Sequence, residues 1–92
     1  MGLYLMFGKY NPGSLQKISH ERTEEASNLI QRNGGTLKSG YAMLGESDLL
    51  FIVDFPDTSN VLKTSVEMGN RFGISFTSMP AVTVDAFDQL VK

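Results

Sequence analysis

Apolar and polar residues alternate along the chain with two different periods, and these periods predict its strands and helices. Alternation with a period of two, or a short run that is apolar throughout, is typical of strands. Four segments have this pattern: residues 3–7, 36–44, 49–55 and 74–82. Pro80 falls in the last of them, so we expect that strand to end there, to bulge, or to lie at an edge of the sheet.

Apolar residues recur three or four positions apart in the segments outside these strands, which predicts helices. The first helix is expected within residues 15–33. The second begins after an N-cap at Asp57 or Ser59 and includes Gly69, for which we expect a close approach to the sheet. A short third helix follows a cap at Thr83.

The order strand, helix, strand, strand, helix, strand predicts a ferredoxin-like α+β fold, in a single domain that spans residues 1–92. In this fold an antiparallel four-stranded sheet carries two helices on one face, and this chain adds a short C-terminal helix. Residues 3–7 and 49–55 are apolar on both faces of the predicted sheet, so the face without helices would expose a large apolar patch. A second copy that packs sheet against sheet about a two-fold axis would cover this patch. The sequence therefore predicts a homodimer through the open sheet face, a dimeric α+β barrel.

Short motifs along the chain resemble those of the GYD-domain family, small proteins of the dimeric α+β barrel group. The family is named for a Gly-x-Tyr-Asp motif at the turn into the third strand, where this chain has Gly45-Glu46-Ser47-Asp48, with Ser47 in place of the motif tyrosine. Further similar positions follow in the same order over nearly the whole chain: Ser19-His20-Glu21-Arg22, Gly34-Gly35, Tyr41, Pro56-Asp57 and residues 83–87. The resemblance implies the ferredoxin-like fold and the homodimer. It implies no particular chemistry, because the family has none assigned.

Composition and charge narrow the classes of function. The chain has 92 residues, of which 41% are hydrophobic and 20% charged, as is typical of one globular domain. Eight basic and ten acidic residues are scattered along it, so binding to nucleic acid is not expected. The apolar run at residues 3–7 is too short to cross a membrane and lacks the features of an export signal, so we expect a cytoplasmic protein without membrane contact.

Several kinds of chemistry have no support in the sequence. No cysteine is present, which excludes disulfides, thiolate metal sites and thiol nucleophiles. Phosphate loops, nucleophile elbows, paired-histidine metal motifs and dinucleotide fingerprints are absent, so neither a cofactor nor a metal is expected. Four methionines are interpreted as gap filling in a small core rather than as a copper site: Met6, Met43, Met68 and Met79.

Three residues are candidates for catalysis: His20, Tyr41 and Asp48. His20 is the only histidine, so it could move a proton near neutral pH, or it could simply be solvated on the first turn of a helix. Asp48 could act as a general base or bind a cation together with Glu46. Alternatively, Asp48 makes hydrogen bonds to backbone near its turn, where Gly45 supplies a positive φ.

Tyr4, Arg22 and Tyr41 are candidates for binding a small ligand, and Tyr10 could line the same pocket as the other two tyrosines. Tyrosines often line binding sites and offer a hydroxyl, although the same rings also fill cores and interfaces. Arg22 could hold an anionic group of a ligand, or it could pair with a glutamate such as Glu25 on the helix surface.

Three functions remain open at this point. The sequence favours a non-catalytic, homodimeric domain that binds a small ligand or a protein partner, because no set of base, nucleophile and orienting group is evident. The alternative is a cofactor-independent oxygenase or isomerase that acts on a small hydrophobic molecule and uses His20, Tyr41 and Asp48. A small folded module without any ligand is the third possibility.

Overall fold

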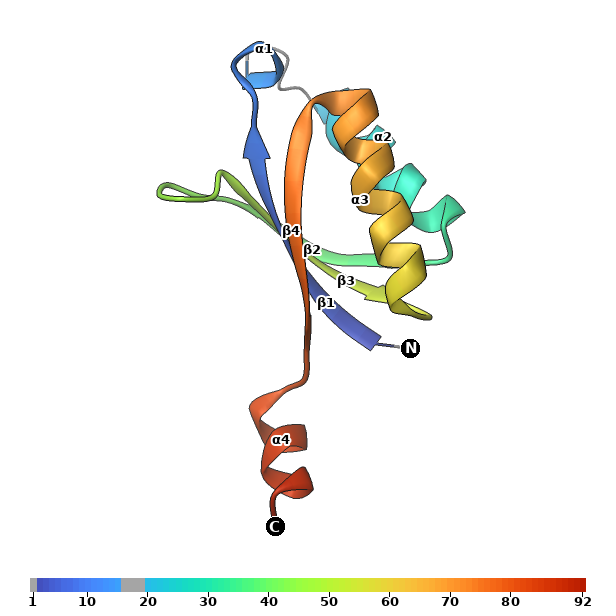
Figure 1. Ribbon diagram of the computed structural model, residues 1–92, viewed down its shortest axis with the longest axis vertical. Coiled ribbons are helices and arrows are strands. Elements are labelled where there is room, and N and C mark those ends of the chain that lie inside the picture. The colour runs from blue at the N-terminus through green and yellow to red at the C-terminus, as the bar shows by residue number, and fades with distance from the viewer. Residues whose placement is uncertain (1, 16–19) are drawn as a thin grey trace.

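The computed structural model describes residues 2–15 and 20–92, with the side chains of residues 2–13 and 21–92. Four strands form one antiparallel sheet in the order β2-β3-β1-β4: β1 (Gly2–Tyr10), β2 (Thr36–Ala42), β3 (Leu49–Phe55) and β4 (Ile74–Ala81). The helices are α1 (Pro12–Leu15), α2 (His20–Arg32), α3 (Thr58–Phe72) and α4 (Val84–Leu90). Both α2 and α3 lie on the same side of the sheet (Figure 1). The predicted ferredoxin-like fold is confirmed. No helix in the described part of the chain is long and apolar enough to span a membrane.

The element boundaries differ from the expected ones mainly near the N-terminus. Strand β1 continues beyond Phe7 to Tyr10, because β3 pairs with it as far as Gly8 and β4 as far as Tyr10, which pairs with Ile74. The expected first helix is divided into α1, which covers Pro12–Leu15, and α2, and the segment 16–19 between them lies outside the described residues.

Two predicted helix caps are present. The Asp57 carboxylate accepts a hydrogen bond from the Asn60 amide at 3.2 Å, so Asp57 rather than Ser59 is the N-cap of α3. The Thr83 hydroxyl accepts a hydrogen bond from the Ala86 amide at 3.0 Å and caps α4. Both caps satisfy backbone donors that the first turn of a helix would otherwise leave unpaired.

The core lies between the sheet and helices α2 and α3. Its fully buried side chains come from all of these elements: Met6, Ile30, Val53, Phe55, Val61, Thr64 and Met68. Thr64 is the one polar member, and its hydroxyl donates to the Asn60 carbonyl at 2.7 Å. The Asn33 amide group donates to the Thr64 hydroxyl at 2.9 Å and to Glu67 at 2.7 Å, which joins the end of α2 to α3.

Gly69 does not have the tight environment that its position in a helix suggested. A Cβ atom built on Gly69 would lie 3.6 Å from the Ile74 carbonyl oxygen, an ordinary contact, with no other described atom within 4 Å. Gly35, which follows α2, is packed tightly against the sheet, because its Cβ would lie 2.6 Å from the Phe55 ring. The close approach to the sheet expected for Gly69 therefore occurs instead at Gly35, after the end of α2.

A β-bulge in β2 changes which residues share a face. Leu37 pairs with Val53 before the bulge, and Tyr41 pairs with Leu50 after it. Because Val53 and Leu50 are three positions apart in one strand, they belong to opposite faces of the sheet. Regular alternation over residues 36–44 would place Leu37 and Tyr41 on the same face, but the extra residue at the bulge inverts the alternation and separates them.

The face of the sheet opposite α2 and α3 carries apolar side chains, as the two-sided pattern predicted. We call it the open face. Strand register places on it the apolar or aromatic residues Leu3, Leu5, Phe7, Tyr41, Leu50, Ile52, Met79 and Ala81, and the polar residues Lys9, Thr36, Ser39, Asp54, Ser75 and Thr77. The connection between β2 and β3 projects from the sheet on this side (Figure 1). Helix α4 stands beyond the end of the sheet, and every residue from Val82 to Lys92 is exposed.

Candidate functional site

A cavity of about 370 Å³ lies between α2 and the part of the sheet formed by β2 and β3. Most of its lining is apolar or aromatic, and it draws on α2, all four strands and the end of α3. The lining residues are Tyr10, Arg22, Thr23, Ala26, Leu37, Gly40, Tyr41, Ala42, Leu49, Phe51, Phe72 and Ile74. Gly40 leaves room for the Phe51 ring in the lining, because a Cβ at position 40 would lie 3.2 Å from that ring.

One cation lies at the cavity. The guanidinium carbon of Arg22 is 5.2 Å from the centre of the Tyr10 ring, a cation–π arrangement. Arg22 is the only ionised side chain among the described lining residues. Of the glutamates near Arg22 in the sequence, Glu25 lies 3.7 Å from Arg71, with both side chains about half exposed. The cavity thus combines a large apolar surface with a single positive group.

Asp48 connects the loop before β3 to the end of β1. Its carboxylate accepts a hydrogen bond from the Tyr10 amide at 3.0 Å and lies 3.7 Å from the Lys9 ammonium group. Its own amide donates to the Gly8 carbonyl, and its carbonyl accepts from the Met43 amide, both at 2.8 Å. Asp48 is not among the residues that line the cavity, but its carboxylate contacts the backbone amide of Tyr10, which is one of them.

The remaining sequence candidates lie apart from one another. Tyr4 is 8% exposed in the core, and its hydroxyl is 3.0 Å from that of Thr58 at the start of α3. Tyr10 lies six positions after Tyr4 in β1, a distance of about 20 Å along a strand. Tyr41 belongs to the open face by strand register, but it lies on the edge strand β2, where it also borders the cavity, and its side chain is 54% exposed. His20 is the first residue of α2, and its side chain lies outside the described part of the structure.

No metal site forms around the proposed carboxylate pair. Among the described residues, no group of three histidine, aspartate or glutamate side chains is placed to hold an ion. Glu46 is exposed, whereas Asp48 is occupied by Tyr10 and Lys9. Gly45 has φ +136°, so the glycine supplies the positive φ that the turn was expected to need.

A second concavity, of about 460 Å³, lies on the open face near the β2–β3 connection. We call it the open-face groove, and it is lined by Phe7, Met43, Leu44, Glu46, Ser47, Thr77 and Met79. Met6 and Met68 fill the core as expected, but Met43 and Met79 line this groove instead. Flexible methionine side chains are common on surfaces that adapt to a partner.

The family model described as the GYD domain matches residues 4–91, almost the whole chain. The chain belongs to the GYD-domain family. The structure of this GYD domain is similar to the crystal structure of the Mycobacterium tuberculosis leucine response regulatory protein, with a TM-score of 0.63 and 10% sequence identity. The similarity covers 90% of the GYD domain and 51% of the regulatory protein, so the domain spans about half the length of that chain. At such low identity this similarity shows the fold alone. No curated protein matches the sequence significantly.

The GYD motif position and the cavity are adjacent in this domain. Asp48 is the last residue of the motif position. It accepts a hydrogen bond from the backbone amide of Tyr10, and Tyr10 lines the cavity. Sequence reasoning did not single out the apolar lining, because residues such as Ala26 and Leu49 look like ordinary core positions. Only the pairing of Tyr10 with Arg22 could have indicated the cavity, and the two are twelve residues apart in segments of different structure.

Proposed function

We propose that this GYD domain is a homodimeric, non-catalytic binding domain for a small, mainly apolar ligand that carries one anionic group. The cavity between α2 and the sheet is the observation that supports the binding role most directly. Its volume of about 370 Å³ falls within the usual range for small-molecule sites, and its apolar walls would bury the body of such a ligand.

The anionic group follows from the charge at the cavity. Arg22 supplies the only ionised side chain among the described lining residues, and its planar guanidinium group suits a carboxylate. The ring of Tyr10 contacts the guanidinium group from one side and restricts its motion. The Arg22 side chain therefore loses less conformational entropy when a ligand binds. A ligand that is apolar with one acidic group complements both features.

A non-catalytic role agrees with the position of Asp48, the candidate general base. An oxygenase or isomerase would need a proton acceptor near the bound molecule. The Asp48 carboxylate instead accepts from the Tyr10 backbone amide and faces Lys9, outside the cavity lining. This geometry favours a structural role for Asp48 over that of a base.

The homodimer is supported by the open face. Leu5 lies at the centre of this face, where its cross-strand partners are Ile52 and Met79. In addition, the Asp54 Oδ1 atom is buried and has no hydrogen-bond partner among the described residues. A second copy packed on this face would remove the apolar side chains from water and could supply the missing donor.

Ligand binding can be tested with 2-naphthoate and its neutral analogue 2-naphthalenemethanol, by calorimetry and by amide chemical-shift mapping. We expect both to shift resonances of residues that line the cavity, such as Ala26 and Leu49. Ala42→Trp should abolish binding because the new ring fills the space, whereas Leu62→Trp on the exposed surface of α3 should not. Arg22→Gln should weaken the binding of 2-naphthoate by about 10- to 100-fold, which corresponds to the loss of a hydrogen bond to a charged group. The dissociation constant of 2-naphthalenemethanol should change by less than about threefold.

The ligand proposal fails if Ala42→Trp and Leu62→Trp bind naphthoate equally well, or if the shifts map outside the cavity. The homodimer is tested separately by sedimentation equilibrium, in which the wild-type chain should have twice its mass of 10.1 kDa. Leu5→Glu should give a folded monomer, because it places a charge at the centre of the open face. Leu62→Glu is the matched control and should remain a dimer. A monomeric wild-type chain would refute the dimer.

A further inference from the structure

Helix α4 carries an apolar stripe that nothing in the described part of its own chain buries. Val84, Phe87, Leu90 and Val91 lie on one side of the helix, at spacings of three and four residues, and each is 54–75% exposed. Asp85 and Gln89 lie on the opposite side. The helix has only seven residues, and a helix this short is not stable in water without tertiary packing. The apolar stripe therefore requires a surface to pack on.

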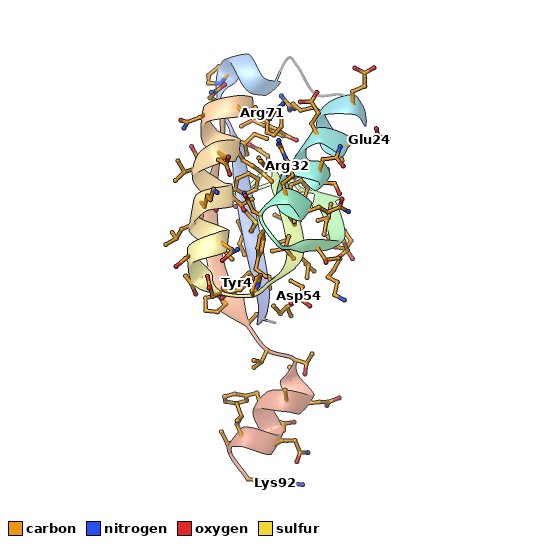
Figure 2. The ribbon with its side chains drawn as sticks, turned by 90° about the vertical axis from the view of Figure 1, so that its right-hand side faces the viewer. Tyr4, Glu24, Arg32, Asp54, Arg71 and Lys92 are labelled. Atoms are coloured by element: carbon orange, nitrogen blue, oxygen red, sulfur yellow. The ribbon has the colours of Figure 1, made fainter. Side chains whose placement is uncertain are left out.

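That surface is not the body of the same chain. Strand β4 carries the chain past the end of the sheet, and α4 lies beyond it, away from α2 and α3 in both views (Figures 1 and 2). The molecule is accordingly elongated, with extents of 48 × 29 × 19 Å. A surface on another molecule is needed.

The open-face groove offers a matching surface, because four of its lining residues are apolar: Phe7, Met43, Leu44 and Met79. The groove lies at the opposite end of the sheet. Ala81, which leads into α4, pairs with Leu3 near the start of β1. Leu49, which follows the β2–β3 connection, pairs with Gly8 near the end of β1. In the groove Leu44 is fully exposed and Met79 is 44% exposed, so both lose apolar surface to water if a helix docks there.

We infer that α4 docks in the open-face groove of a second copy of this chain, and that the second copy returns the same contact. The inference rests on the homodimer proposed above. If two sheets meet through their open faces with the strands running in opposite directions, the α4 end of each sheet lies beside the groove end of the other. One two-fold axis then buries both stripes and both grooves at once, as an isologous interface requires.

The side chains suit this contact. Met43 and Met79 are flexible enough to fit around the aromatic ring of Phe87. Thr77, on the edge strand β4, leaves a polar rim beside them, which is the usual arrangement around the apolar centre of an interface. Asp85 remains in water on the outer side of the docked helix.

The absence of natural cysteine allows a direct test by disulfide trapping. Leu44→Cys and Phe87→Cys are prepared as separate full-length chains, mixed, unfolded and refolded together, and then oxidised. A disulfide needs Cα atoms within about 7 Å, so a covalent dimer that joins position 44 to position 87 forms readily only if α4 docks in the partner's groove. We expect this product, identified by mass spectrometry of the linked peptides, to form at least about tenfold faster than the product from Leu62→Cys mixed with Phe87→Cys.

A second measurement does not depend on cysteine chemistry. Phe87→Ser should weaken the dimer about 100-fold, because each of two symmetric contacts loses about tenfold when half a phenylalanine side chain is no longer buried. Leu62→Ser should leave the dissociation constant unchanged. The docking is overturned if the chain is a dimer but position 87 shows no preference for position 44, or if Phe87→Ser dimerises like the wild type. A monomeric wild-type chain would instead overturn both the docking and the homodimer.

Discussion

Replacing Asp48 by alanine should destabilise the fold, because Asp48 holds the β2–β3 connection against the end of β1. The change removes a hydrogen bond from the Tyr10 amide to a carboxylate, with a donor–acceptor distance of 3.0 Å. It also removes the 3.7 Å ion pair with Lys9. A hydrogen bond to a charged group contributes about 1.5–3 kcal/mol, and an exposed ion pair well under 1 kcal/mol. Because the Asp48 side chain is 29% exposed, we expect a loss near the lower limit, about 1.5 kcal/mol.

The assay is urea unfolding followed by circular dichroism, with the free energy of unfolding extrapolated to water. In a domain of this size, about 1.5 kcal/mol corresponds to a decrease in Tm of about 6–12 °C. Asp48→Asn keeps an acceptor for the Tyr10 amide, so it should lose less than about half as much as Asp48→Ala. A loss below about 0.5 kcal/mol for Asp48→Ala, or equal losses for the two variants, would show that this hydrogen bond does not stabilise the loop.

Two glycine substitutions should have opposite effects on the free energy of unfolding in the same assay. Gly69→Ala should stabilise the domain by up to about 1 kcal/mol, because alanine favours helix and its Cβ meets only the Ile74 carbonyl at 3.6 Å; a decrease in stability would contradict the assigned space. Gly35→Ala should destabilise by about 1–3 kcal/mol, since its Cβ would lie 2.6 Å from the fully buried Phe55 ring; an unchanged Tm would contradict the packing at this point.

The fold could be predicted because its elements depend on local patterns. The alternation in β3 and the cap at Asp57 each involve residues close in sequence, so the observed bounds Leu49–Phe55 and the start of α3 agree with the predicted ones. The bulge in β2 could not be predicted in this way. No glycine or proline stands between Leu37 and Ser39 to mark it, and the inversion follows from pairing with β3.

The cavity could not be predicted, because it is formed by residues that are distant in sequence. Arg22 was a candidate for an anionic ligand, but its neighbour Tyr10 reaches it only through the continuation of β1 beyond Phe7. Tyr4 was an equally reasonable choice from the sequence, yet strand geometry places it at the other end of β1, under α3. The residue types indicated which side chains could bind a ligand. The sequence did not show which of them lie at the end of β1 that reaches the cavity.

The family motif lies next to the open-face groove, and Glu46 and Ser47 of the motif position line it. Gly45 adopts φ +136°, a conformation that residues with a side chain rarely adopt, and Asp48 ties the same loop to β1. Together they hold Leu44 and Ser47 at the groove, on the face away from the cavity. Ser47 stands where the family motif has tyrosine, so the smaller side chain leaves space in the groove that a docked helix can occupy. If two copies of the chain meet as proposed above, the motif position builds part of the contact surface between them.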